Sequence, residues 1–290
     1  MIKYTIDNNG KKIKAIDFDN LNEQLLYIQK PIKDKAYSVI DQVKQEDNFY
    51  GTHTLDQSLQ GMKYGFDNDT NYFLDNIAQV QNDDGLTGGI HVDVEGFAYD
   101  MGSVVEGIPE CCLNSNLPTP TPSVTIMVDI AFSWCVSARA ISNRGIAITN
   151  LINTLLLNGY IVDLYLLRYN SQYDLDIMYT VKIDTTNLSI ANIAYVCTPE
   201  YFRKIGWITT DVLREKESES GRGQSKILPF MLNKIKKEKI FFIGGDYSDS
   251  NITSHLDSVK NANNYILETF KKYCNENKIT IKFIENVDKT

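Results

Sequence analysis

The sequence has little of what marks secreted, disulfide-bonded or membrane-spanning proteins. Its five cysteines are odd in number and form no CxxC pair, so they suggest neither a disulfide framework nor a zinc ribbon. Met1–Asp7 lacks the apolar run of a signal peptide, and no stretch approaches the roughly 18 uncharged apolar residues of a membrane span. We therefore expect a soluble intracellular protein with reduced thiols and no membrane partner.

Common catalytic and nucleotide-binding motifs are also missing. The chain contains no GxxxxGK[ST], GxSxG, HExxH or GxGxxG segment. Only three histidines are present, and the sequence shows no second metal-ligating or catalytic residue beside His53 or His255. These absences argue against the usual hydrolases and nucleotide-binding enzymes without excluding every enzyme.

Positive charge is in deficit. The 29 lysines and arginines stand against 37 aspartates and glutamates, which gives a net charge of −8 and a pI near 5.0. Because nonspecific affinity for nucleic acid comes mainly from Lys and Arg, we do not expect nucleic acid as the main partner. With 43% hydrophobic and 23% charged residues, the chain has the composition of a globular protein that buries a core.

Residues 1–84 predict a hairpin followed by helices. Asn8-Asn9-Gly10 lies between two short apolar runs and is typical of a tight hairpin turn. Helical spacing follows on either side of Pro31, and Thr54 with Gln57 fits a capping box for a third helix that ends near Gly65. A fourth helix is expected over residues 72–80. We expect this region to be peripheral, and residues 85–122, rich in Gly and Pro, to form a connection of loops and short strands.

Residues 123–290 predict an α/β domain. Val124–Asp129 is the apolar run of a strand buried on both faces, and a helix of about four turns follows, with Gly159 at its carboxyl cap. Residues 161–167 predict the next strand, so the unit is a right-handed βαβ crossover with parallel strands. The other expected elements are an antiparallel edge strand over 175–183, helical pieces over 188–214, a solvated loop over 214–226, a strand over 240–243, a helix over 254–277 and a last strand over 279–284. The predicted fold is an open, mostly parallel sheet with flanking helices, Rossmann-like in its layering.

Acidic and hydroxyl side chains follow two of these strands. In an open parallel sheet, ligands bind beyond the carboxyl ends of the strands, where the strand order reverses. If the strands that end before Asp129 and Asp246 are neighbours, then Asp129, Ser133 and Asp246 converge there. Oxygen ligands of this kind suit Mg²⁺, Ca²⁺ or Mn²⁺ rather than zinc. The same acids are also compatible with a metal-free site in which they cap a helix or bind solvent.

The helix after the central strand offers a second candidate site. Arg144 and Gly145 lie in its first turns, where backbone N–H groups and a guanidinium can hold a phosphate. The alternative is that Gly145 permits close packing.

The segment Asp129-x-Ala131-x-Ser133 resembles the Asp-x-Ser-x-Ser signature of von Willebrand factor A domains. The following helix, the hairpin of residues 164–183 and a later strand before Asp246 match the order of that fold. The resemblance implies a divalent ion held by Asp129, Ser133, Asp246 and a threonine, for which Thr198 is the candidate, with an open position for a partner's carboxylate. Ala131 departs from the signature and removes one hydroxyl ligand, so the implied site is degenerate.

Three further segments are similar to a family of uncharacterised bacteriophage-encoded proteins. They are Phe49-Tyr50-Gly51-Thr52, Gly107-Ile108-Pro109-Glu110-Cys111 and Asn143-Arg144-Gly145. No activity follows from this resemblance. It implies a location in the cytoplasm of a bacterial host cell or in a virion.

Three functional hypotheses follow. The first is a phage-type binding or scaffold protein whose von Willebrand A-like domain contacts a protein partner, with or without a divalent ion. The second is an Mg²⁺-dependent enzyme that acts on a phosphorylated substrate, with Asp129 and Asp246 holding the ion and Arg144 the phosphate. The third is RNA binding, against which the acidic pI weighs.

Overall fold

The computed structural model describes most of the chain. The described residues are 1–8, 11–44, 49–65, 90–93, 98–99, 112–115, 123–132, 135–171, 176–183, 185, 190–215, 240–244 and 254–279. Within them, no helix is both long enough and apolar enough to cross a membrane. Three predicted elements lie outside these ranges: the helix over 72–80, the loop from 216 onward, and the last strand beyond Ile279.

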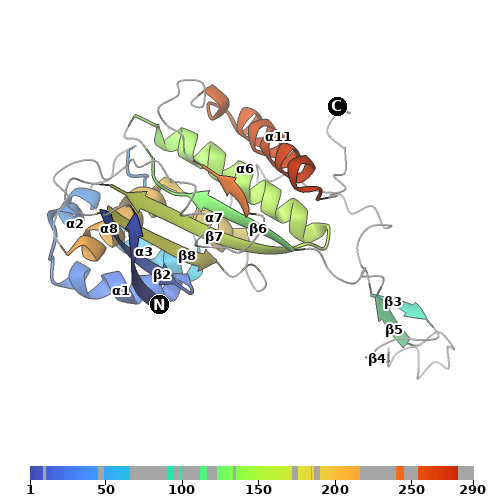
Figure 1. The fold of residues 1–290 in the computed structure, drawn as a ribbon, viewed down its shortest axis with the longest axis horizontal. Helices are drawn as coiled ribbons and strands as arrows, with labels where there is room; N and C mark the ends of the chain where they lie inside the picture. The colour runs from blue at the N-terminus through green and yellow to red at the C-terminus, as the bar shows by residue number, and fades with distance from the viewer. Residues whose placement is uncertain are drawn as a thin grey trace.

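A six-stranded sheet forms the centre of the molecule (Figure 1). Its strands are β1 (Ile2–Asn8), β2 (Lys11–Phe18), β6 (Ser123–Asp129), β7 (Ile161–Asn170), β8 (Asp176–Ile183) and β9 (Ile240–Ile243), in the order β1-β2-β8-β7-β6-β9. β6 pairs in parallel with both β7 and β9, and β2 pairs in parallel with β8, whereas β1–β2 and β7–β8 are antiparallel. The predicted α/β class with a mostly parallel sheet is confirmed.

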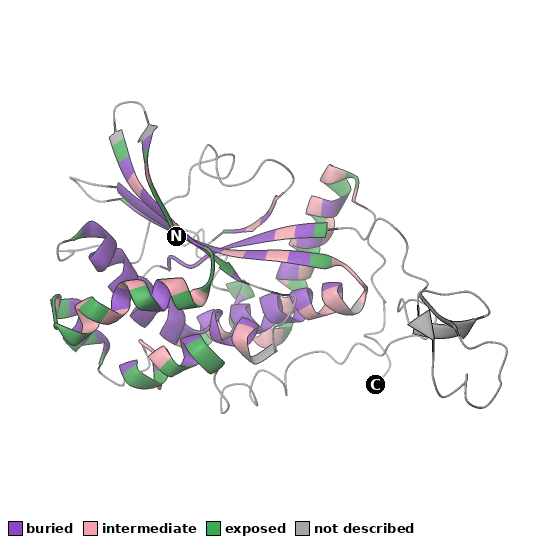
Figure 2. Cartoon of the chain, turned by 90° about the horizontal axis from the view of Figure 1, so that it is seen from below, coloured by how far each residue is buried: buried purple, intermediate pink, exposed green. Residues whose placement is uncertain are grey.

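Helices cover one face of this sheet. They are α1 (Leu21–Lys33), α2 (Ser38–Val43), α3 (Leu55–Tyr64), α6 (Ala138–Leu157), α7 (Ile190–Tyr195), the π-helix η1 (Glu200–Ile205), α8 (Gly206–Arg214) and α11 (Val259–Asn277). Figure 2 shows most of them on one side of the strands. The larger core cluster joins their apolar side chains to one face of the strands, while a second cluster on the opposite face contains strand residues only, among them Met127, Leu167 and Met178.

Local signals define the predicted elements well. Thr54 and Gln57 make the reciprocal capping box, and Gly65, with φ of 75°, follows α3. Ser137 accepts a hydrogen bond from the Ala140 N–H at the start of α6, and Gly159, with φ of 76°, lies just beyond its end. These residues form the caps of helices to which they are adjacent in sequence, so the sequence alone indicates where the helices begin and end.

The amino-terminal hairpin is not peripheral, and this prediction was wrong. β2 pairs with β8, with Ile13 opposite Asp176, so β8 is an inner strand and not the predicted edge. The Asp17 carboxylate accepts hydrogen bonds from the Thr180 hydroxyl at 2.5 Å and from the Tyr4 hydroxyl at 3.3 Å, which ties three strands together. The sheet therefore joins residues from the predicted 1–84 region to the predicted 123–290 domain.

Two smaller predictions also need correction. Helix α1 continues through Pro31 to Lys33, although the proline has no N–H to donate within the helix. Arg214, expected in a solvated loop, is buried at the end of α8 and donates to the Asn170 side chain at 2.5 Å. Residues 85–122 contain the short strands expected there, β3 (Ile90–Asp93), β4 (Ala98–Tyr99) and β5 (Cys112–Ser115), which form an antiparallel sheet of order β3-β5-β4.

Candidate functional site

The carboxyl end of β6 is the point where strand order reverses. The chain leaves β6 through α6 to reach β7 on one side, and β9 lies on the other side, with all three strands parallel. Asp129 ends β6 and is 3% exposed. Its Oδ1 accepts a hydrogen bond from the Ala131 N–H at 2.8 Å. The carboxylate thus shapes the turn after the strand at the edge where α/β sheets bind ligands.

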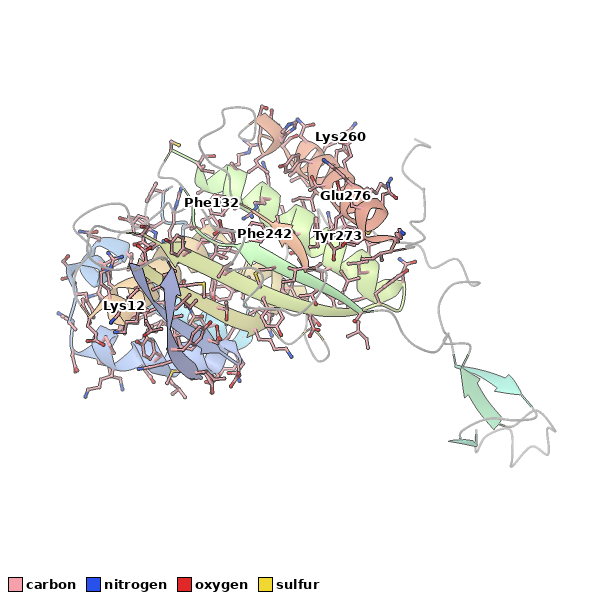
Figure 3. All side chains as sticks on the ribbon, in the orientation of Figure 1. Lys12, Phe132, Phe242, Lys260, Tyr273 and Glu276 are labelled. Carbon is pink, nitrogen blue, oxygen red and sulfur yellow. The ribbon has the colours of Figure 1, made fainter. Side chains whose placement is uncertain are left out.

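Arg144 fastens the ends of β6 and β9 together. Its guanidinium donates to the backbone oxygens of Asp129 at 3.0 Å, Ile243 at 2.8 Å and Gly244 at 3.3 Å. The same group lies over the Phe132 ring, 4.9 Å from its centroid, and Figure 3 shows Phe132 beyond the tip of β6 near the start of α6. Arg144 is 3% exposed. Its phosphate role stays a prediction, and a phosphate would have to displace these bonds.

Gly145 allows α6 to approach the residues after α7. A Cβ atom at this position would lie 2.5 Å from the Cys197 backbone oxygen, closer than such atoms approach in proteins. This distance supports the packing interpretation of Gly145. The Asn143-Arg144-Gly145 segment, of which Asn143 also donates to the Leu256 oxygen, therefore has a structural task at each residue.

A second guanidinium, that of Arg168 on β7, reaches the same strand end. Its Nη1 donates to the Ile130 oxygen at 3.1 Å and to the Phe202 oxygen at 3.4 Å, and the residue is 1% exposed. Burial lowers the pKa of this guanidinium, while Tyr179, Asp129 and Asp211 act in the opposite direction. Gly206 makes room for it, because a Cβ there would lie 3.2 Å from Nη1.

The predicted metal ligands are only partly within the described residues. Ser133 and Asp246 lie outside them. The Thr198 hydroxyl donates to the Tyr195 oxygen at 2.7 Å and accepts from the Tyr201 N–H at 3.3 Å, so it serves the turn that leads into η1. Across the described ranges, no three His, Cys, Asp or Glu side chains are grouped as metal ligands.

The two predicted ligands within the described residues do not by themselves make a divalent-ion site. The Asp129 carboxylate already accepts a backbone hydrogen bond, and the Thr198 hydroxyl is bonded to the residues around it. Arg144 and Arg168 bring positive charge to the backbone oxygens of Asp129 and Ile130. Mg²⁺ and Ca²⁺ prefer six or more oxygen ligands, and fixed positive charges oppose their binding. The metal site stays a prediction that the sequence makes.

The π-helix η1 holds the segment 49–53 against this edge. Glu200, 3% exposed, accepts from the Thr52 N–H at 2.8 Å, and its carboxylate lies 3.2 Å from His53 Nδ1. Arg203 donates to the backbone oxygens of Phe49, at 2.7 Å, and Val136, and Lys204 donates to the His53 oxygen. We call Glu200, Arg203, Lys204 and residues 49–53 the η1 clasp. π-Helices occur disproportionately at functional sites.

The η1 clasp is the part of the site that sequence reasoning missed. The partners in it are about 150 residues apart, as for Thr52 and Glu200, and no spacing rule connects residues so distant. The signal was present in Phe49-Tyr50-Gly51-Thr52, one of the segments similar to the phage-encoded family. Gly51 has φ of 88°, and a Cβ there would lie 2.1 Å from Glu200 Oε1, so the clasp explains why glycine stands at this position.

Two aromatic side chains of the clasp form a cluster with the Trp207 side chain of α8. Phe49, Tyr50 and Trp207 are each partly exposed, and their ring centroids are 5.0 to 5.7 Å apart. The Arg203 guanidinium lies 3.9 Å from the Phe49 centroid, and its bond to the Val136 oxygen places this aromatic cluster beside the loop that follows β6. The cluster is an amphipathic surface on a charged, buried support.

The three described cysteines, Cys135, Cys197 and Cys274, should differ in their reactivity toward alkylating reagents. Burial raises the pKa of Cys197 to about 12 and that of Cys274 to about 11, whereas Cys135 is exposed. Because the thiolate is the reactive form, we expect iodoacetamide at pH ~8 to modify Cys135 rapidly and to leave Cys197 and Cys274 intact until the protein is denatured. Peptide mass spectrometry measures each site, and equal native labelling of Cys135 and Cys197 would contradict the burial.

The fold and this site define an α/β protein in which η1 holds residues 49–53 close to the carboxyl end of β6. The model of a family described as a domain of unknown function, DUF7192, matches residues 5–274 of the chain. The chain belongs to this family. The match runs through all three predicted regions, across residues 84 and 122. No curated protein and no solved structure matches the chain.

Proposed function

We propose that this chain is a binding or scaffold protein that recognises a protein partner at the clasped edge of its sheet. The observation that carries the proposal is the aromatic cluster of Phe49, Tyr50 and Trp207, whose rings are partly exposed. Three hydrogen bonds from side chains of η1 hold the backbone of residues 49–53 in place beneath it. Partly exposed aromatic side chains on a rigid support are typical of the residues that dominate protein interfaces.

The buried polar groups at this edge support a binding role over a catalytic one. Arg144, Thr198, Glu200 and Arg203 each make hydrogen bonds that hold loops and strand ends together. The proposal rests in part on the order of β6, α6, the β7–β8 hairpin and β9 along the chain, which resembles that of a von Willebrand A-like domain. The proposal includes that resemblance and the phage-type origin, in a virion or in the bacterial host cell.

Site-specific crosslinking tests the proposal. A photoreactive phenylalanine analogue replaces Tyr50 in the cluster or, as the control, Tyr64, which is 71% exposed at the end of α3. We expect one defined protein to crosslink from position 50 in cells that express the chain, and none from position 64. That protein is then purified, and we expect Trp207→Ala to weaken its binding at least tenfold, as for an aromatic anchor.

Two results would contradict the proposal. One is the same set of crosslinked proteins from both positions, which indicates nonspecific contact. The other is a Trp207→Ala variant that binds the purified partner within about twofold of the parent chain, since interface anchors cost more than this.

A further inference from the structure

The strand β1 forms one end of the six-stranded sheet. It pairs with β2 on one side, and no other strand in the described part of the chain pairs with it. Figure 1 shows β1 in dark blue beside the N-terminus. Because an antiparallel strand directs its N–H and C=O groups to either side at alternate residues, every second residue of β1 directs them to this outer edge. Such an edge is a template for pairing with a further strand.

β1 lacks the main features that prevent edge-to-edge pairing. Its register with β2 runs without a break from Ile2 opposite Asp17 to Asn8 opposite Lys11, so it contains no bulge. It contains no proline, and its seven residues are the length of an ordinary strand. Its one lysine, Lys3, has its Nζ 5.0 Å from the centroid of the Tyr27 ring on α1, so this charge lies against the helix layer rather than across the edge.

Apolar side chains are exposed around the same edge. Ile2 on β1 is 60% exposed, and Leu26 on α1 is 61% exposed. The Glu23 carboxylate, one helical turn before Leu26, lies 2.7 Å from the Met1 amino group, so this part of α1 is beside the start of β1. Exposed apolar groups that gather in one place mark interaction surfaces. Association along β1 would bring the apolar groups of two such surfaces together.

The sequence of β1 is complementary to itself in the antiparallel direction. When two copies of the strand pair about a two-fold axis at Thr5, Lys3 of one copy lies opposite Asp7 of the other, and the same pair repeats beyond the axis. Tyr4 then lies opposite Ile6. Opposite charges and an aromatic residue beside a β-branched one are both stabilising cross-strand pairs. An axis at Tyr4 would instead place Lys3 opposite Thr5 and lose both charged pairs.

We propose that two copies of this chain associate through β1, antiparallel about Thr5, so that their sheets become one continuous sheet. A second copy fits the edge because the strand matches its own reversed sequence in charge and in apolar pairs. The proposal goes beyond partner binding and does not depend on it, since the aromatic cluster lies by the carboxyl end of β6, and three strands separate β6 from β1 in the sheet. A dimer would present that cluster twice.

The first test is the molar mass of the isolated chain, measured by sedimentation equilibrium between ~1 and ~300 µM. We expect a 33.0 kDa monomer at the lowest concentration and a growing share of dimer above it. Pairing along one strand edge buries less surface than a standard stable interface, so we expect the association to be reversible in this range. A monomer at every concentration would overturn the proposal.

A disulfide test locates the two-fold axis. Thr5→Cys, combined with Cys135→Ser to remove an exposed native thiol, sets two thiols opposite each other, with Cα atoms about 4.5 to 5.5 Å apart, which a disulfide spans. Lys3→Cys with Cys135→Ser is the control, because two copies of residue 3 lie about 14 Å apart along the paired strands.

Mild oxidation should give a covalent dimer linked through residue 5 and none linked through residue 3. Peptide mass spectrometry identifies the linked residues, so dimers joined through other cysteines are recognised as such. Equal linkage from both positions would indicate random collision and overturn the proposal, as would the absence of linkage from either.

Charge exchange tests the self-complementarity. Lys3→Glu and Asp7→Lys each set like charges opposite each other in a dimer of identical copies, so each variant alone should associate at least about tenfold more weakly than the parent chain. A mixture of the two variants restores both opposite-charge pairs and should associate about as strongly as the parent chain.

Lys272→Glu makes the same change of charge at an exposed position on α11 and serves as the control. Its association should stay within about twofold of the parent chain, since it lies outside the paired edge. A mixture of Lys3→Glu and Asp7→Lys that associates no better than either variant alone would overturn the proposal.

Discussion

Replacing Gly51 by alanine is expected to lower the free energy of unfolding by about 3 kcal/mol. The left-handed backbone at φ of 88° costs a residue with a Cβ atom about 1 kcal/mol. The new Cβ would also lie 2.1 Å from Glu200 Oε1, so the buried carboxylate must move away from the Thr52 N–H and His53, which costs about 1 to 3 kcal/mol more. Urea denaturation measures the change.

Gly159 provides the matched control. Its φ of 76° is similar, but a Cβ there has nothing within 4 Å. Gly159→Ala should therefore cost only the backbone term of about 1 kcal/mol. Equal losses for Gly51→Ala and Gly159→Ala would contradict the packing of residues 49–53 on η1.

Arg203→Met is expected to destabilise the protein by about 2 to 4 kcal/mol, because the buried backbone oxygens of Phe49 and Val136 lose their donor. Arg203 is 1% exposed and joins η1 to Phe49 and to Val136 through its guanidinium, with the Phe49 ring stacked against it. Methionine keeps much of the volume and removes the hydrogen bonds, so two buried backbone oxygens lose a donor. We also expect crosslinking from position 50 to fall, because the aromatic cluster loses its support.

Arg139→Met is the control for this change. Arg139 is exposed, and a substitution there should alter the free energy of unfolding by less than about 0.5 kcal/mol. A loss below about 1 kcal/mol for Arg203→Met would show that the clasp contributes little to stability, in conflict with the cost of leaving two buried backbone oxygens without a donor.

The elements that the sequence predicted correctly share one property. Apolar alternation or periodicity within one segment defines β6, α6 and β9, and short-range caps such as Thr54 with Gln57 define where helices begin. Each signal lies within about 20 residues, so side chains and backbone groups close in sequence determine it. The candidate position of Asp129 at a strand end followed from the same local pattern.

The parts that the sequence did not predict depend on distant pairs. The pairing of β2 with β8 joins residues more than 160 positions apart, and it turned an expected edge strand into an inner one. A hydrophobic strand pattern states that a strand is buried but not which strand lies beside it. The same holds for Arg168, because its position on a buried strand did not indicate that it donates to the backbone oxygens of Ile130 and Phe202.

By itself, the sequence determined the α/β class, the central βαβ unit and the presence of an acid at the end of its first strand, because these follow from local periodicity and capping. Only the tertiary structure decided what surrounds that acid. It brought Arg144 and Arg168 to the strand end and folded residues 49–53 onto η1. Buried charges select partners by proximity in space, which long-range packing establishes and sequence spacing does not record.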